Sequence, residues 1–150
     1  SGNQGRALNN EVNRLHAVLR MASEEAIYSN TEIGVRFDSG TYAFLLYDEK
    51  EGSWVEAQQR FLRSYALPEW IVMEWRTDEE VYLPDESNSG SPVNDNDSEE
   101  KLPDLVMYSS GEVSPFVISF ELDNDPDSLL EIKTNEQGEI ILPHLLERDV

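Results

Sequence analysis

The chain has 150 residues, of which 39% are hydrophobic, a length and composition that suit one domain with a single core. Its net charge is -20, from 31 acidic and 11 basic residues, which argues against nucleic acid or an anionic membrane surface as a partner. It has no cysteine, which excludes disulfides and thiol chemistry and leaves the cellular compartment open.

The first predicted element is an amphipathic helix over residues 6–29. Its apolar residues recur at alternating spacings of four and three, so they fall within an arc of about 80° on an α-helix. This core stripe, which we expect to pack against the rest of the domain, consists of Leu8, Val12, Leu15, Leu19, Ala22 and Ala26. Residues 1–5 open with Ser-Gly, which is typical of a cleaved tag, and we expect a disordered start there.

Patterns with a period of two follow the helix. Residues 33–37 and 42–47 flank a short loop that contains a glycine, which is the layout of an antiparallel hairpin. Further strands are expected at 54–55, 60–66, 70–76, 105–109, 113–122, 129–133 and 139–142. One helix followed by many short antiparallel strands indicates the α+β class, with the helix packed on a β-sandwich or on two β-sheets.

A strongly acidic segment interrupts these strands. Residues 77–100 include nine acidic side chains and no basic one. Such a segment cannot bury enough apolar surface to offset the chain entropy that ordering would cost. We therefore expect a mobile acidic loop over about residues 84–103.

The stretch SSGEVSPFVISF, residues 109–120, joins a polar turn to an apolar run. No histidine lies near its serines in sequence, and a Gly-x-Ser-x-Gly elbow is missing, so a serine hydrolase is not indicated. Gly111 allows a positive φ in the turn, and Pro115 suits the start or edge of a strand. Alternate residues would then face the core, namely Phe116, Ile118, Phe120 and Leu122. The stretch predicts a turn that orients a core strand.

A calcium site can be considered where three aspartates alternate, at Asp123, Asp125 and Asp127, as they do at the start of an EF-hand loop. The sixth position of such a loop would be Ser128, where glycine is needed for the turn. The twelfth would be Thr134, where a bidentate glutamate is needed. We therefore reject calcium here and expect an acidic hairpin loop. Zinc is not indicated either, because the sequence lacks cysteine and a His-Glu-x-x-His motif.

The chain also has features that a carbohydrate-active enzyme could use. Paired carboxylates could hydrolyse a glycoside, and Trp54, Trp70 and Trp75 could stack on a sugar. With 31 acidic residues, however, many carboxylate pairs arise by chance. Core tryptophans and solvated acids are the simpler interpretation, so we expect neither an enzyme nor a cofactor.

Three stretches carry a family resemblance: ASEEAIYSN at 22–30, the hairpin sequences IGVRF and YAFL, and SGEVSPF at 110–116. Together they resemble the GspH (EpsH) class of minor pseudopilins, which belong to the type II secretion system and to the type IV pilin-like superfamily. The helix-to-hairpin stretches are shared with related minor pilins. The last stretch is more specific, and its marker residues are Ser110, Gly111, Glu112, Pro115 and Phe116.

The resemblance implies a pilin-like fold, in which the first half of a long N-terminal helix anchors the protein in the membrane and forms the filament core. Residues 6–30 would be the C-terminal half of that helix, and residues 31–150 a β-rich periplasmic head. It further implies a structural subunit near the pseudopilus tip, methylated at its native N-terminus and anchored in the inner membrane of a Gram-negative bacterium. Its partners would be the other minor pseudopilins and the major pseudopilin, and the assembly would assist export of folded proteins across the outer membrane.

For partner contact, the candidates are the polar helix face around Asn13, Arg14 and Arg20 and the acidic loop. A minor type IV pilin or competence pseudopilin is the alternative among structural proteins, and a calcium-dependent binding module is a more distant one. The pilin alternative differs in the partners it binds, whereas the calcium module would show a calcium-induced shift in melting temperature.

Overall fold

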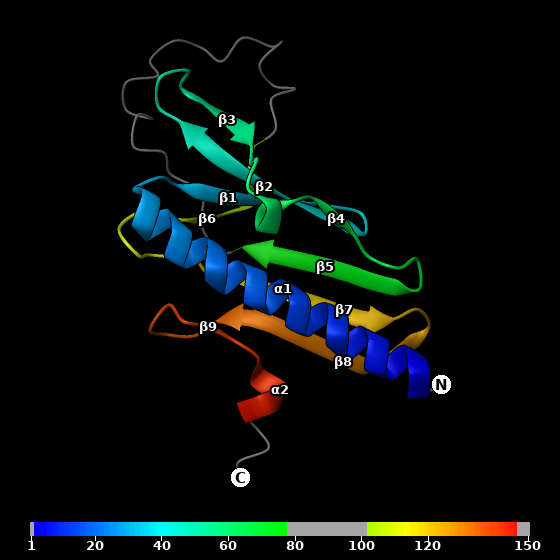
Figure 1. The fold of residues 1–150 in the computed structure, drawn as a ribbon. Helices are drawn as coiled ribbons and strands as arrows, with labels where there is room; N and C mark the ends of the chain where they lie inside the picture. Colours follow the sequence, from blue (N-terminus) through cyan, green and yellow to red (C-terminus); the bar gives the residue numbers. More distant parts are fainter. Residues whose placement is uncertain (1, 78–101, 147–150) are drawn as a thin grey trace.

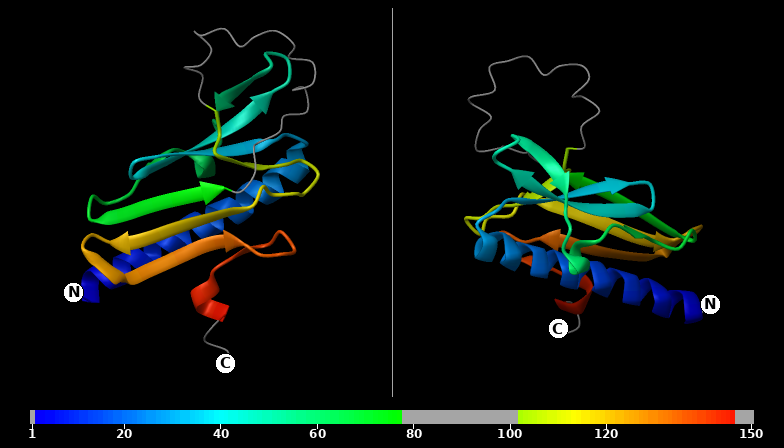
Figure 2. Two further views of the ribbon diagram at one scale, coloured as in Figure 1. Left: turned by 180° about the vertical axis from the view of Figure 1, so that it is seen from behind. Right: turned by 45° about the horizontal axis from the view of Figure 1, so that its top comes forward.

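The computed structural model describes residues 2–77 and 102–146. One long helix, α1 (Gly2–Ser29), lies along one side of two antiparallel sheets (Figures 1 and 2). The predicted α+β class is therefore confirmed, with two sheets. The predicted acidic loop over about 84–103 lies outside the described residues, except for its last two positions, Leu102 and Pro103.

The helix follows the predicted pattern, because all six residues of the core stripe are buried. It begins at Gly2, so the expected disordered start is wrong for residues 2–5. This segment contains no proline, and extending an existing helix adds one hydrogen bond for each residue fixed. The helix ends in a Schellman motif, in which the N–H of Thr31 bonds the carbonyl of Ala26 and the N–H of Asn30 bonds that of Ile27. Asn30 takes the left-handed conformation that this motif needs, with φ 53°.

Sheet A has the strand order β3-β2-β1-β6. Its strands are β1 (Ile33–Asp38), β2 (Thr41–Asp48), β3 (Ser53–Glu56), β6 (Leu105–Met107) and the two-residue β4 (Tyr65–Ala66), which pairs with β2. The predicted hairpin is confirmed as β1 and β2, in a register that sets Ile33 opposite Leu46. Gly40 makes the hairpin turn possible, since its φ of 73° is costly for other residues.

Sheet B has the order β5-β7-β8-β9. Its strands are β5 (Ile71–Thr77), β7 (Phe116–Leu122), β8 (Asp125–Thr134) and β9 (Ile140–Ile141). Strand β7 lies in the middle, and its residues alternate between buried and half-buried positions. The predicted inward positions Phe116, Ile118, Phe120 and Leu122 are all buried.

Three local predictions need correction. Residues 60–66 form a 3-10 turn, η1 (Arg60–Leu62), followed by β4 rather than one strand. The neighbours Phe61 and Leu62 both pack on the core, which a strand does not allow because its side chains alternate in direction. Strand β7 starts at Phe116 instead of 113, with Val113 making only an isolated bridge to Met107. A short helix, α2 (Pro143–Leu146), follows β9 and was not expected.

The main core lies between the core stripe and the inner faces of both sheets. A second, smaller cluster lies on the opposite face of sheet A and is formed by Leu45, Tyr47, Trp54 and Val106. Gly34 underlies this second cluster. A Cβ at Gly34 would come 2.5 Å from Cβ of Pro103, so only glycine lets Pro103 pack this closely on the sheet.

The two sheets are linked by the side chain of Asp104. Its carboxylate accepts a 2.7 Å hydrogen bond from the backbone N–H of Phe37 in β1 and a further one from the Trp75 side chain in β5. The rings of Phe37 and Trp75 also lie 5.2 Å apart. Burial raises the pKa of the Asp104 carboxyl, while the Phe37 N–H and the nearby Arg36 oppose that rise.

Candidate assembly surface

The helix residues predicted to contact partners do not form one patch. Asn13 and Arg20 are exposed and lie seven residues apart, which is about two helical turns and places them on one face. Arg14 is rotated by about 100° from Asn13, and its guanidinium carbon lies 4.0 Å from the centre of the Tyr65 ring. All three side chains are exposed, but Arg14 contacts Tyr65 within the domain, whereas Asn13 and Arg20 lie on another face of the helix.

Arg14 belongs to a polar junction between α1 and sheet A. The hydroxyl of Tyr65 donates to the carboxylate of Glu11, with distances of 2.9 and 3.0 Å to its two oxygens. Burial, and then the bond to Glu11, raise the pKa of Tyr65. Tyr42 packs beside Tyr65, and burial raises the pKa of its hydroxyl to about 12, although Arg14 opposes the rise. The junction fixes the rotation of the helix relative to the sheet.

The marker turn, residues 108–112, is a closed turn in the connection from β6 in sheet A to β7 in sheet B. The N–H of Gly111 bonds the carbonyl of Tyr108 at 2.9 Å, and the N–H of Tyr108 bonds the carbonyl of Glu112 at 2.8 Å. Gly111 has a φ of 99°, which confirms the positive φ expected for it. A Cβ at Gly111 would lie 3.6 Å from Cδ1 of Ile27, so the turn lies against the end of α1.

A buried carboxylate that the sequence analysis missed holds this turn in place. Glu32 is 7% exposed, and its Oε1 accepts bonds from the N–H of Ser109 at 3.0 Å and from the Ser109 hydroxyl at 2.7 Å. The carbonyl of Glu32 also accepts a bond from the N–H of Tyr47. The only available signal was a charged residue directly before the apolar start of a strand.

The end of the marker stretch passes the chain from sheet A to sheet B. The hydroxyl of Ser114 accepts a 2.8 Å bond from the N–H of Val106, and the N–H of Ser114 bonds the carbonyl of Val106. Pro115 follows, and the N–H of Phe116 then bonds the Thr134 hydroxyl in β8. This confirms the prediction that the turn orients a core strand and that Pro115 precedes it.

The aspartates considered for calcium lie at the hairpin between β7 and β8. Leu122 pairs with Asp125, so Asp123 and Asn124 form the two-residue turn, and Asn124 has a φ of 62°. The hydroxyl of Ser128 bonds the N–H of Leu122. The predicted acidic hairpin loop is confirmed. Within residues 2–77 and 102–146, no three His, Cys, Asp or Glu side chains gather in a way that could hold a metal ion.

The tryptophans considered for sugar stacking are mainly packing residues. Trp54 is buried and lies edge-on to Tyr47, with ring centres 5.3 Å apart. Trp75 packs on Phe37, and Trp70 is a half-buried residue at the edge of the main core. The predicted structural role of these side chains is confirmed.

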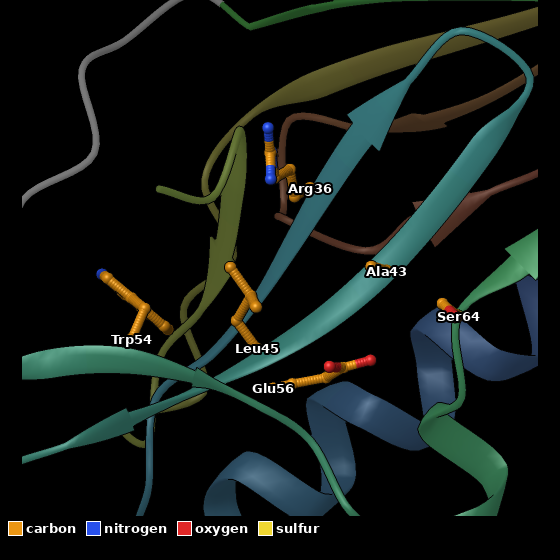
Figure 3. Close-up of a pocket in the computed structure, with 6 residues that line it drawn as sticks. All are labelled: Arg36, Ala43, Leu45, Trp54, Glu56 and Ser64. Atoms are coloured by element: carbon orange, nitrogen blue, oxygen red, sulfur yellow. The ribbon is translucent and has the colours of Figure 1, made fainter. Parts of the chain in front are cut away.

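A shallow hollow of about 250 Å³ opens on the outer face of sheet A (Figure 3). Ala43 lines it on β2, between the positions that pair with the end of β3 and with the start of β4. The other lining residues are Arg36, Leu45, Trp54, Glu56 and Ser64. Arg36 and Glu56 put one cation and one anion at the hollow, without an arrangement of nucleophile and base.

Exposed apolar side chains gather at the C-terminal end of α1. Met21 is 45% exposed, Ile27 54% and Tyr28 89%. On an α-helix these three positions span an arc of about 120°, centred about 160° from the core stripe. We name them the helix-end patch. The sequence pattern did not predict this patch, because the candidates for partner contact on the helix were polar residues.

None of the helices in the described part of the chain is long and apolar enough to cross a membrane. Compared with known proteins, residues 11–138 match the family described as type II transport protein GspH. The chain is 31% identical over 112 residues to type II secretion system protein H of Pseudomonas aeruginosa, covering 74% of this chain and 61% of that protein. It is 24% identical over 146 residues to protein H of Aeromonas hydrophila, covering 91% of this chain and 75% of that relative.

The fold is also similar to a solved structure, the minor pseudopilin EpsH from the type II secretion system of Vibrio cholerae. That comparison has a TM-score of 0.71 at 25% identity and covers 91% of this chain and 93% of the EpsH chain. The solution structure of GspH from Escherichia coli gives a TM-score of 0.60 at 16% identity, which concerns the fold alone. The chain thus spans less than two thirds of the Pseudomonas protein and nearly all of the EpsH structure.

Proposed function

Because the chain belongs to the GspH family of type II transport proteins, we propose that it is the head of a minor pseudopilin, a structural subunit of the type II secretion pseudopilus. Its function would be to assemble with other subunits near the tip of that filament and so assist export of folded proteins across the outer membrane. In this role it catalyses no reaction and needs no cofactor.

The observation that carries the proposal is the way α1 is built into the head. All six core-stripe residues are buried against the two sheets, and the Glu11–Tyr65 bond and the Arg14–Tyr65 contact fix the rotation of the helix. A head held this rigidly would follow the position of a filament rod continuous with its helix. A displacement of the rod would then move the head loops by the same amount, because no flexible hinge between helix and head would absorb it.

The outward helix face with Asn13 and Arg20 is the proposed site for contact with neighbouring pseudopilins. Both side chains are exposed, so they can pair with another subunit without disturbing the core. Arg14 is not part of this face because it already contacts Tyr65. The head would lie in the periplasm, on a native chain anchored in the inner membrane.

The proposal is tested by assembly of the full-length protein in the bacterium that encodes it. Cysteines placed at Asn13 and Arg20, in a chain that has none of its own, allow crosslinking to other pseudopilins that carry cysteines. We expect specific crosslinks to another minor pseudopilin or to the major pseudopilin. Crosslinks only to subunits of a type IV pilus would show that the protein is a minor pilin instead.

A further inference from the structure

The helix-end patch and the marker turn form one continuous surface. Ile27 belongs to the patch, and its Cδ1 lies 3.6 Å from the position of a Cβ on Gly111 in the turn. The turn is held by the bonds of Glu32 to Ser109 and by its own two backbone bonds. The surface is therefore pre-organised, which lowers the entropy cost of binding a partner.

The exposure of this surface is unusual for a solvated helix end. In the described ranges eight large hydrophobic side chains are exposed, and three of them lie within eight consecutive residues of α1. Tyr28, at 89% exposure, extends away from the domain at the last turn before the Schellman motif. Clusters of exposed apolar side chains mark interaction sites, and tyrosine is enriched among the residues that contribute most to binding.

The charges around the patch indicate what kind of partner fits. Glu24 lies within the arc of the patch, Glu25 lies beside it, and Glu112 follows Gly111 in the marker turn. The last turn of α1, which is described in full, contains no basic residue. The C-terminal end of a helix dipole is itself negative, so these three glutamates add to an unfavourable potential, which the single basic residue Arg20, four positions before Glu24, offsets only in part. A cationic partner would relieve it.

We propose that the helix-end patch and the marker turn form a docking site for a neighbouring pseudopilin subunit that presents an apolar contact bordered by lysine or arginine. The partner would cover the apolar side chains of the patch, and the partner's basic residues would pair with Glu24, Glu25 and Glu112. This inference rests on the proposed function, because it takes the occupant to be a pseudopilin. It extends the outward helix face with Asn13 and Arg20 to the C-terminal end of the helix, because both residues lie within the arc of the helix-end patch.

The test is a titration of this head against the purified periplasmic heads of the other pseudopilins from the same secretion system. Tyr28→Ser and Ile27→Ser should each weaken binding of one of these heads at least tenfold. Leu129→Ser is the matched control, because Leu129 is 48% exposed on β8, and it should change the affinity less than twofold. A double change, Glu24→Lys with Glu25→Lys, should weaken binding and reduce its dependence on salt.

The outcomes separate the two proposals. A pseudopilin head that binds the wild type and the patch variants equally would overturn the docking site and leave the proposed function standing. Binding that is weakened at Tyr28 but is insensitive to salt and to the glutamate changes would overturn the basic partner. If no pseudopilin head binds the wild type, both the docking site and the proposed function are contradicted. Unchanged melting temperatures of these variants would show that any loss of affinity comes from a lost contact with the partner and not from unfolding.

Discussion

The carboxylate of Glu32 bonds both the backbone N–H and the hydroxyl of Ser109, at 3.0 and 2.7 Å, although 77 residues separate the two in sequence. This pair ties the loop after α1 to the marker turn. It explains why a charged side chain is buried at the start of β1, since its oxygen is satisfied there.

Replacing Glu32 tests this connection. Glu32→Ala would leave the buried N–H of Ser109 without its acceptor, so we expect the free energy of unfolding to fall by about 1–3 kcal/mol. Glu32→Gln keeps an oxygen acceptor and should lower the free energy of unfolding by less. Urea denaturation measures both, and an alanine variant as stable as the wild type would show that the bond to Ser109 has no role in stability.

Gly111 and Gly5 form a matched pair for the marker turn. Gly111→Ala forces an alanine to a φ of 99° and should destabilise the head by about 1–3 kcal/mol. Gly5→Ala adds the same methyl group inside α1, where nothing lies within 4 Å, and should stabilise by about 0.5–1 kcal/mol. Thermal unfolding followed by circular dichroism compares the two. Equal effects of both changes would contradict the strained turn.

Arg14 and Arg20 were predicted to act together, yet the structure separates their roles. Arg14→Ala removes the contact with the Tyr65 ring and should lower the free energy of unfolding by about 0.5–1 kcal/mol. Arg20→Ala removes an exposed side chain, and we expect a change of less than about 0.5 kcal/mol. If Arg20→Ala destabilised the head as much as Arg14→Ala, the contact of Arg14 with Tyr65 would not distinguish the two arginines.

The raised pKa of Asp104 predicts a pH dependence. The folded state keeps this proton at pH values where the unfolded chain, with its carboxyl near the ordinary value of 3.8, has lost it. The contribution of Asp104 to stability therefore decreases as pH rises from about that value through the folded pKa. Asp104→Asn cannot titrate and keeps an oxygen that can accept from Phe37.

The measurement is urea unfolding of both proteins at a series of pH values from acid to neutral. We expect the stability of Asp104→Asn, relative to the wild type, to increase with pH over this range. A difference that stays constant, or that decreases with pH, would mean that the carboxyl is not held in its protonated form by burial.

Local pattern was sufficient for the elements with strong periodicity. The core stripe and the alternation from Phe116 to Leu122 both follow from side-chain spacing, and both are buried as predicted. The same holds for the hairpin of β1 and β2, whose turn residues are typical. The marker turn was identified because glycine and proline restrict the backbone in recognisable ways.

The features that the sequence did not predict depend on contacts between residues that are distant in sequence. The bond from Phe37 to Asp104 spans 67 positions, and no local period encodes it. Residues 60–66 carry enough apolar side chains for a strand, but a 3-10 turn lets Phe61 and Leu62 reach the core together. The helix-end patch was missed for a different reason, because exposed apolar residues do not differ in sequence from buried ones.

The central claim is that this chain is the head of a secretion pseudopilin, and export by the bacterium that encodes it tests that claim most directly. The gene is deleted, and the full-length protein is returned as wild type, as Leu15→Asp or as Asn9→Asp. Leu15 is fully buried, so an aspartate there should prevent folding of the head, while Asn9 is exposed and serves as the control. The measured quantity is the fraction of a folded type II exoprotein found outside the cell. We expect the exoprotein to remain in the periplasm of the deletion strain and of the strain with Leu15→Asp. The wild type and Asn9→Asp should restore its export. Export that is undiminished by the deletion would contradict the claim.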